Sequence, residues 1–518
     1  MNMRMTFKPW KVVFGVIMAL GAYATVIRFT QGLGATTNLS NEFPWGLWIG
    51  FDILVGVGLA AGGFVVAATV HLFQIEKYEP VARPAILTAF LGYLLVIVAL
   101  MFDLGRPYRI WHPLVMGNPH SVMFEVAMCV MLYTVVLACE FSPIVFARFK
   151  MEKALKVVRT VYIPLVILGV LLSTLHQSSL GTMYVIVPDK LHGLWYTPLL
   201  PVFFFLSAVS VGLAMTIFES FMSARAFGKR LESELLEGMA RVAVVTLALL
   251  LLMRFMDLHS RGNLHLAFTG SPESVMFWGE VMLGVALPMV LFAMNRVRRS
   301  EEGLFFGALL TVMGFIINRL NVAITGMAGS SGVNYVPTWM EFAVTTSIVA
   351  AGFLLFYLAV KHLNVFPDDE VAQALRGVPV AERPRFRGRP IAAMWGLLAV
   401  GVVLFGFTSN WQNRGPEAST VDVPTFRASG PVTLPEELAL PVSEDSPGPV
   451  TFDHSTHVDT SAPNCGACHA GLFKITSEGI ATRTFVGHGS DDGTRCDTCH
   501  NGDDAFDWEE DCEMCHVE

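Results

Sequence analysis

The sequence has little charge. Only 15% of its 518 residues are Asp, Glu, Lys or Arg, whereas 53% are hydrophobic, and the mean hydropathy is +0.54. Ordinary soluble domains carry about 25% charged residues, so this composition excludes one. No run of Lys and Arg with interleaved aromatics is present, and nucleic-acid binding therefore has no support. The composition predicts an all-α polytopic membrane protein.

Long apolar runs predict eleven transmembrane helices, because a hydrocarbon core about 30 Å thick needs about 20 apolar residues per helix. They are expected near residues 10–29, 44–74, 83–104, 121–146, 158–180, 194–219, 241–258, 274–294, 303–320, 338–361 and 390–408. The membrane domain is thus expected to cover residues 1–409.

Basic residues fall on alternate connections between these runs, as in residues 147–159, 223–230 and 361–389. Because Lys and Arg accumulate in cytoplasmic loops, the N-terminus is expected in the cytoplasm. Everything after about residue 409 is then expected in the periplasm, outside the cytoplasmic (inner) membrane. The first run, with Ala-Tyr-Ala at 22–24, also fits a cleavable signal, whose loss would leave the remaining topology unchanged.

Cysteine is scarce in the membrane region, and six of the eight cysteines lie in the tail. Residues 410–450 are rich in Pro, Ser and acids and are expected to form a linker, followed by a small domain at 451–518. Its cysteines form three Cys-x-x-Cys-His units, the pattern that attaches c-type haem: Cys465, Cys468 and His469; Cys496, Cys499 and His500; Cys512, Cys515 and His516. Zinc binding or disulfides explain three such units within 52 residues less well.

Each haem iron also needs a sixth ligand, normally His or Met. From residue 450 onward the only Met is Met514, inside the third unit, whereas three His lie outside the units: His454, His457 and His488. The counts predict three bis-His c-type haems of low potential. So few residues per haem predict a haem-packed domain with little regular secondary structure.

The tail resembles the class III multihaem cytochromes of the three-haem, cytochrome c7-like kind, in which a His pair spaced as in "FDHSTH" precedes the first "CGACH". The resemblance implies that His454 binds the haem on Cys465 and Cys468. By the same resemblance His457 serves the haem on Cys512 and Cys515, and His488 the haem on Cys496 and Cys499.

An internal repeat organises the membrane region. "GLW" at 46–48 returns at 193–195, "NPHSVMFEV" at 118–126 returns as "SPESVMFWGEV" at 271–281, and "LSTLHQSSLG" is echoed by "INRLNVAITG". An offset near 145 to 155 residues predicts two related, parallel four-helix bundles, at about residues 44–180 and 194–326.

Ionisable residues gather near one end of these runs. An ionisable side chain within a membrane span is expensive and is usually functional or paired. Structural ion pairs, such as Arg254 with Asp257, are one interpretation, and a functional site is the other. The candidates for a site are Asp103, Arg106, His112, Glu125, His176, Arg254, Asp257 and Arg319.

Two kinds of site compete for this cluster. A b-type haem needs facing histidines within the membrane, but His176 is the only His well inside a helix at this level, and His71 and His362 fall at the opposite face. No b-type haem is therefore expected. A quinone headgroup needs hydrogen-bonding partners and a proton-exchanging group. Asp103, Glu125 and His176, with Arg106 close by, are expected to supply them in one pocket.

The same segments resemble the NrfD family of membrane subunits, and most closely its HybB-like branch: "PWGLWIGFD", "FDLGRPYRIWHP", "NPHSVMFEVAMCVMLY", "LHQSSLGTMY" and "NRLNVAITG". The resemblance covers about residues 40 to 360. It implies a haem-free, quinone-reactive integral subunit of a larger redox complex, docked to a periplasmic iron-sulfur subunit with ferredoxin-like clusters. The haem tail departs from that pattern.

We therefore expect a subunit of a quinone/quinol oxidoreductase complex that moves electrons between membrane quinone or menaquinone and periplasmic haems, in either direction. The acidic run 503–518 favours a basic partner such as a multihaem cytochrome. One alternative is a structural anchor and electron conduit for a periplasmic hydrogenase or reductase, without its own quinone site. A transporter with parallel repeats is another, but the paired Gly/Pro breaks expected of one are lacking.

Overall fold

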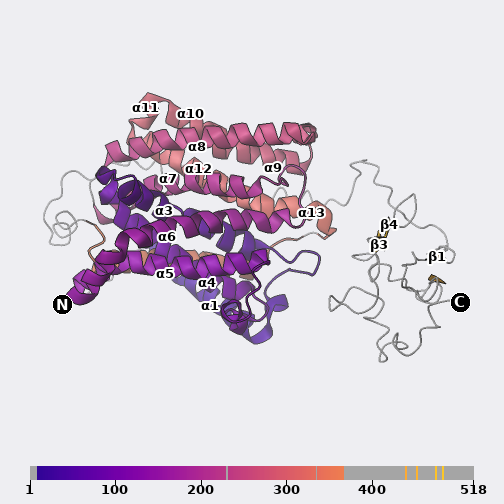
Figure 1. Cartoon of the computed structure of the whole chain (residues 1–518), viewed down its shortest axis with the longest axis horizontal. Coiled ribbons are helices and arrows are strands. Elements are labelled where there is room, and N and C mark those ends of the chain that lie inside the picture. The colour runs from indigo at the N-terminus through magenta and orange to yellow at the C-terminus, as the bar shows by residue number, and fades with distance from the viewer. Residues whose placement is uncertain are drawn as a thin grey trace, which may run out of the picture. The chain divides into compact units, whose positions relative to one another are not determined.

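The computed structural model describes residues 9–188, 190–228, 231–333 and 335–366, together with four two-residue strands further along the chain. The chain divides into two compact units, Met1–Gly415 and Pro416–Glu518. The described helices all belong to the first unit (Figure 1).

Within the described residues, ten helical segments are long and apolar enough to cross a membrane, which confirms the first ten predicted spans. The eleventh, at 390–408, lies outside the described residues. Seven of the described spans are single helices: α1 (Pro9–Gln31), α4 (Glu79–Asp103), α5 (Val122–Arg148), α6 (Glu152–Val185), α7 (Leu200–Phe227), α8 (Ser233–Ser260) and α14 (Trp339–His362).

Three spans are interrupted by π-helical turns. The second span comprises η2 (Trp48–Val55), α2 (Gly56–Leu59), α3 (Gly62–Ala67) and η3 (Ala68–Leu72). The eighth comprises α9 (Pro272–Val281), η8 (Met282–Ala286) and α10 (Leu287–Ala293), and the ninth α12 (Glu301–Leu320), η9 (Asn321–Thr325) and α13 (Gly326–Ser331). Such π-turns are frequent at functional sites. Here η8 and η9 flank the buried polar residues described below.

Short helices connect the spans: η1 (Leu33–Ala35), η4 (Glu76–Tyr78), η5 (Pro107–Arg109), η6 (His112–Leu114), η7 (Asn263–Phe268) and α11 (Asn295–Arg298). In the second unit β1 (Leu438–Ala439) pairs antiparallel with β2 (Thr451–Phe452), and β3 (Phe473–Lys474) with β4 (Ala481–Thr482). The Cys-x-x-Cys-His units lie outside the described residues.

Eight of the ten described spans form two closed four-helix bundles. In the first bundle the second span packs against α4, α4 against α5, α5 against α6, and α6 back against the second span. In the second bundle α7, α8, the eighth span and the ninth span close in the same order. The predicted pair of parallel bundles is therefore present, and a shared hydrophobic core joins them. Helices α1 and α14 pack on each other, and α14 also packs on α4.

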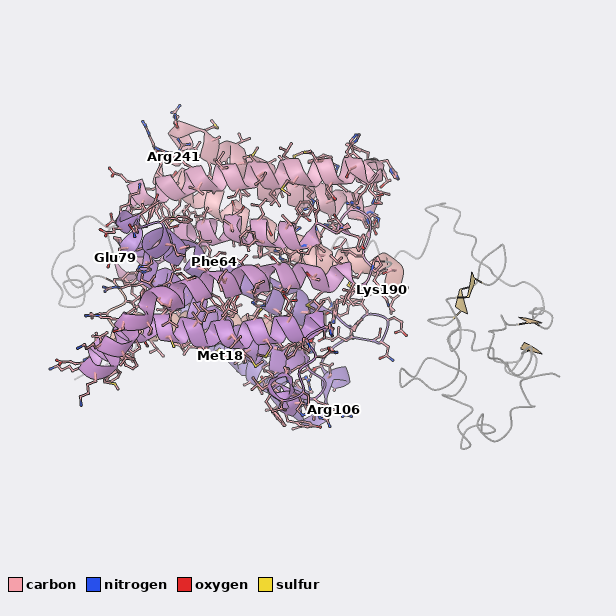
Figure 2. The ribbon with its side chains drawn as sticks, viewed as in Figure 1. Met18, Phe64, Glu79, Arg106, Lys190 and Arg241 are labelled. Carbon is pink, nitrogen blue, oxygen red and sulfur yellow. The ribbon has the colours of Figure 1, made fainter. Side chains whose placement is uncertain are left out.

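Figure 2 gives two reference points for the ends of the helices. Arg106 and Lys190 lie at one end of the helical layer, and Glu79 and Arg241 lie at the other. We call these the Arg106 end and the Glu79 end.

Small residues allow the closest helix crossing. A Cβ on Gly314 of α12 would lie 1.9 Å from the Cα of Gly284 in η8, so the two backbones touch there. Close approach through glycine is typical of helix pairs in membranes, where packing rather than hydrophobicity joins helices.

Gly314→Ala should therefore destabilise the fold by about 1–3 kcal/mol, because the added methyl group has no space. Gly279→Ala is the matched control: a Cβ on Gly279, in the same span as Gly284, meets nothing within 4 Å. It should be neutral or slightly stabilising, since Ala favours the helix. Thermal unfolding of the purified protein in detergent compares them. Equal midpoints for the two variants would contradict the proposed backbone contact.

Candidate functional site

His176 lies at the centre of a buried polar group in the first bundle. It is 0% exposed, and its Nδ1 shares a 2.9 Å hydrogen bond with the hydroxyl of Tyr93 on α4. The ring of Tyr133, from α5, packs edge-on against Tyr93 at 4.7 Å between centroids. Three helices thus meet at this histidine.

Two buried polar atoms of this group have no hydrogen-bond partner in the described part of the chain: Nε2 of His176 and Oε1 of Gln177. On α6 the spacing of Ser173, His176 and Gln177 places them on one face. Buried polar atoms are nearly always bonded, so this face suits a polar ligand or ordered water.

Glu125 is bound by a serine of α6, the helix of His176. Ser179, three residues after His176 on α6, donates a 2.6 Å hydrogen bond from Oγ to Oε1 of Glu125. Ser179 is buried, whereas Glu125 is exposed at the start of α5. Ser179 lies one turn of α6 beyond His176, so Glu125 is held near the same helix face, and its association with His176 stays a prediction.

Asp103 belongs to a different group, which corrects the expectation of a single pocket. It ends α4, ten residues beyond Tyr93, and ten helical residues rise about 15 Å. The guanidinium of Arg28, from α1, donates to the carbonyls on either side of Asp103, at 2.6 Å to Phe102 and 2.7 Å to Leu104. One oxygen of Asp103, Oδ1, is buried without a hydrogen-bond partner among the described residues.

Two further carboxyl groups lie near Asp103, close enough for their charges to interact: Glu341 and Asp52. Glu341 accepts hydrogen bonds from the Tyr335 hydroxyl and from the backbone N–H groups of Thr338 and Asn38. Burial, together with the neighbouring Glu341, raises the pKa of Tyr335, so its hydroxyl stays a donor. We call Arg28, Asp52, Asp103 and Glu341 the Asp103 group.

The second bundle has its own buried carboxylate, Glu280, at the position that matches Glu125 in the repeat. It accepts hydrogen bonds from four side chains: Trp195 at 3.0 Å, Asn318 at 2.8 Å, Asn321 at 2.9 Å, and Arg254. Asn321 occupies the repeat position of His176. The carboxylate of the second bundle is thus saturated, while the first bundle keeps unpartnered polar atoms.

Arg319 and Asp257 complete this second cluster. Arg319 is 1% exposed and is sandwiched between the rings of Phe204 and Phe315, 3.6 and 4.3 Å from their centroids. Asp257 pairs with Arg261 at 2.7 Å, and Arg254 pairs with Glu280. The suggested Arg254–Asp257 ion pair is therefore wrong. A cavity of about 50 Å³ lies between these residues, far too small for a quinone headgroup with its tail.

The remaining candidates lie in loops or outside the described residues. Arg106 is exposed before η5, and His112 is half-buried, with its ring against Trp111. The proposed haem ligands are all outside the described residues: Cys465, Cys468, His469, Cys496, Cys499, His500, Cys512, Cys515, His516, His454, His457 and His488.

Sequence reasoning missed several polar members of these groups. Ser173 and Gln177 share a helical face with His176, so the spacing within "LSTLHQSSLG" was a usable signal for them. Trp195 also had a signal, because the tripeptide "GLW" is repeated. Arg28 and Tyr335 lie outside the repeat, and nothing in the sequence marked them.

Comparison with known proteins places these elements in context. Residues 35–329 match the family model described as polysulphide reductase, NrfD, and residues 450–517 match cytochrome c7 and related cytochrome c. A protein of Nitratidesulfovibrio vulgaris is 41% identical over 369 residues, covering 69% of this chain and 94% of that protein. The menaquinone reductase integral membrane subunit of the same organism is 28% identical over 391 residues, covering 70% and 93%.

A further relative corrects one prediction. The probable Ni/Fe-hydrogenase 2 b-type cytochrome subunit of Escherichia coli is 34% identical over 361 residues, covering 69% of this chain and 92% of that protein. The expectation that the membrane domain has no b-type haem is contradicted by this similarity. Among the described histidines, His176 is the one with a buried ring nitrogen, Nε2, that has no hydrogen-bond partner among the described residues.

Glu280→Ala should destabilise the protein strongly, because Arg254 and three neutral donors would lose their buried acceptor. Breaking a buried ion pair by removing one partner typically costs about 3–5 kcal/mol. Glu280→Gln keeps an acceptor oxygen and should cost less. Arg241→Ala is the control. Arg241 forms an ion pair with Glu237, but its side chain is 60% exposed, so the substitution should leave the unfolding midpoint nearly unchanged. Equal midpoints for Glu280→Ala and Arg241→Ala would refute the assigned network.

Proposed function

The chain belongs to the polysulphide reductase NrfD family, and on that basis we propose that it transfers electrons between a membrane quinone and c-type haems held by its own C-terminal residues. The observation that carries the proposal is the presence in one polypeptide of an NrfD match at residues 35–329 and a cytochrome c7 match at residues 450–517. Relatives named as subunits of a menaquinone reductase and a hydrogenase support a place within a larger respiratory redox complex.

The donor set of the tail suits three covalent haems. Each Cys-x-x-Cys-His unit offers two thiols for the porphyrin and one imidazole for the iron. Cys465, Cys468 and His469 would hold the first haem, and the units at Cys496 and Cys512 the others, with His454, His457 and His488 as sixth ligands. Bound haems would supply one-electron carriers.

Quinol oxidation releases two protons as well as two electrons, so the membrane domain needs proton-accepting groups. We assign the first acceptor to Asp103, because its Oδ1 is unpartnered in the described residues and it ends α4 next to a loop. We assign a second proton-exchanging group to His176, whose Nε2 is unpartnered among the described residues, and to the exposed Glu125, which Ser179 of the same helix binds. In the reverse direction these groups would deliver protons to the reduced quinone.

The second bundle has a structural role in this proposal. Its carboxylates Glu280 and Asp257 are held by Arg254 and Arg261. Arg319 is fixed by Phe204, Ser207 and Asn318. Side chains bonded in this way cannot exchange protons without breaking a buried ion pair.

The distribution of basic residues supports an orientation. The connections at the Glu79 end carry most of the described Lys and Arg, including those of 147–159, whereas few lie between α4 and α5. By the positive-inside rule the Glu79 end and the N-terminus would face the cytoplasm. The Arg106 end, and the haem domain with it, would face the periplasm.

An exposed loop favours a partner at the Arg106 end. Between α4 and α5 the large apolar side chains Tyr108, Trp111, Leu114, Val115 and Met116 are exposed. Such a patch outside the membrane spans suits an interface with another subunit, such as an iron-sulfur subunit. This observation also fits the alternative of a membrane anchor and electron conduit that lacks its own quinone site.

Asp103→Asn distinguishes quinol oxidation by this chain from the alternative of a membrane anchor without a quinone site. If Asp103 accepts the quinol proton, the substitution should slow haem reduction by menaquinol analogues about a hundredfold, the scale of general base catalysis. Reduction by dithionite should be unaffected. Glu152→Gln, at the exposed start of α6, is the control and should behave like the unaltered protein. Stopped-flow absorbance of the haems measures all three. An unchanged rate in Asp103→Asn would rule out the assigned acceptor and favour the anchor alternative.

A further inference from the structure

A large cleft lies on the side of the first bundle away from His176. It has a volume of about 390 Å³ and is bounded by the second span, α4, α7 and α14. Gly56, Gly92 and Gly352 line the cleft where the helices approach closely: an added Cβ would lie 3.0, 3.0 and 2.7 Å from side-chain atoms of Val96, Ala60 and Leu95. It is larger than the cavity at Glu280, and its walls are largely apolar. Asp52, which belongs to the Asp103 group, is among the polar residues that line it, with Thr88, Glu219 and Ser223.

One end of the cleft is closed by aromatic rings. At the Glu79 end Phe227 of α7 packs against Phe356 and Tyr357 of α14, with ring centroids 6.4 and 6.2 Å apart. Towards the Arg106 end the wall includes Val349 and Phe353 of α14, which are 40% and 63% exposed. The cleft therefore opens onto the helix surface that faces lipid.

Polar side chains line the cleft at two levels: Asp52 towards the Arg106 end, and Glu219 and Ser223 of α7 towards the Glu79 end. Asp52, in η2, lines the cleft, is 6% exposed, and accepts a 2.7 Å hydrogen bond from the hydroxyl of Thr345 on α14. Only one of its carboxyl oxygens takes part in that bond. Asp52 also lies close enough to Asp103 for their charges to interact. The cleft thus leads from lipid to the edge of the Asp103 group.

The buried carboxyl of Asp52 favours some membrane molecules over others as occupants of the cleft. A phospholipid keeps its charged headgroup at the water interface, so an acyl chain in the cleft would place a methyl terminus against the buried carboxyl of Asp52. A buried carboxyl next to hydrocarbon alone is costly. A quinone has a small uncharged headgroup with hydrogen-bonding oxygens and a long apolar tail, which matches the carboxyl of Asp52 within a largely apolar cleft.

We propose that this cleft binds the isoprenoid tail of the membrane quinone and directs its headgroup to Asp52. The inference rests on the proposed function and adds to it a tail site, an entry route between α7 and α14, and a headgroup contact. The wall on α14 runs from Ile348 to Tyr357, ten residues whose nine steps rise about 14 Å at 1.5 Å per residue. The first part of the tail would lie in this length, and the rest would leave through the opening beside Val349 and Phe353.

A headgroup at Asp52 would also bring the quinol close to Asp103, the proposed proton acceptor. A headgroup held by Asp52 would lie beside the Asp103 group rather than beside His176, on the far side of α4. Thr345 comes from α14, and Arg28 next to Asp103 comes from α1. The two helices outside the repeats would thus complete the quinone site.

Val349→Trp tests the tail site, because an indole at this exposed wall position fills the opening. In the complete chain, within its native membrane complex, the KM for menaquinol-4 should rise at least about tenfold, the loss expected when about two methylene groups are no longer buried. The KM for tail-less menadiol should rise less than about twofold on the same scale. Val245→Trp is the matched control, because Val245 on α8 is 66% exposed and lies outside the cleft. It should leave the KM for both quinols unchanged.

Asp52→Asn tests the headgroup contact and does not depend on folding of the bulkier variant. It should raise the KM for both quinols, because the headgroup is common to them. Equal effects of Val349→Trp and Val245→Trp on menaquinol-4 would overturn the tail site, as would retention of phospholipid rather than menaquinone in the cleft by mass spectrometry of the purified complex. An Asp52→Asn variant with unaltered KM values would overturn the headgroup contact.

Failure of the underlying function would look different. In that case the unaltered complex would show no haem reduction by either menaquinol-4 or menadiol, while dithionite still reduced the haems. If the complex oxidises both quinols and Val349→Trp leaves the KM for menaquinol-4 unchanged, only the proposed tail site in the cleft is contradicted.

Discussion

The structure depends on the cost of an unpartnered carboxylate within a membrane. Lipid offers no hydrogen bonds, so each buried acid must find donors within the protein or exchange protons. Glu280 meets this constraint with four side-chain donors, from α8, from the ninth span and from Trp195 just before α7, and these bonds help to fix how the spans of the second bundle pack. Arg319, held between two aromatic rings, brings α7 and α12 together in the same way.

The two bundles answer that constraint differently at matching positions. His176 of the first bundle is replaced by Asn321 in the second, and an amide bonds to Glu280 without taking up a proton. The imidazole of His176 keeps one nitrogen unpartnered among the described residues. Duplication of a bundle therefore allows one copy to become a rigid support while the other keeps titratable groups available.

The order and approximate bounds of the first ten spans could be predicted, because hydrophobic run length depends directly on bilayer thickness. The pairing of polar residues could not. Asp103 and His176 looked like one site because sequence gives the level of a residue in a helix only roughly, and the partners Arg28 and Tyr93 come from helices whose rotation no run length specifies. Arg254 was paired with Asp257 by proximity in sequence, yet Glu280 on another span holds it. The prediction that the membrane domain has no b-type haem rested on a count of histidines, and the similarity to the Escherichia coli b-type cytochrome subunit contradicts it.

Helices α1 and α14 lie outside both repeats but pack against each other and against α4. Through Arg28 and Thr345 they bring partners to the carboxyl groups of the first bundle only. The two related bundles thus become different in their surroundings, because α1 and α14 lie beside the first bundle. Specialisation of this membrane domain would then have come from what was built onto the duplicated core, and the core itself could stay nearly unchanged while its substrate range shifted.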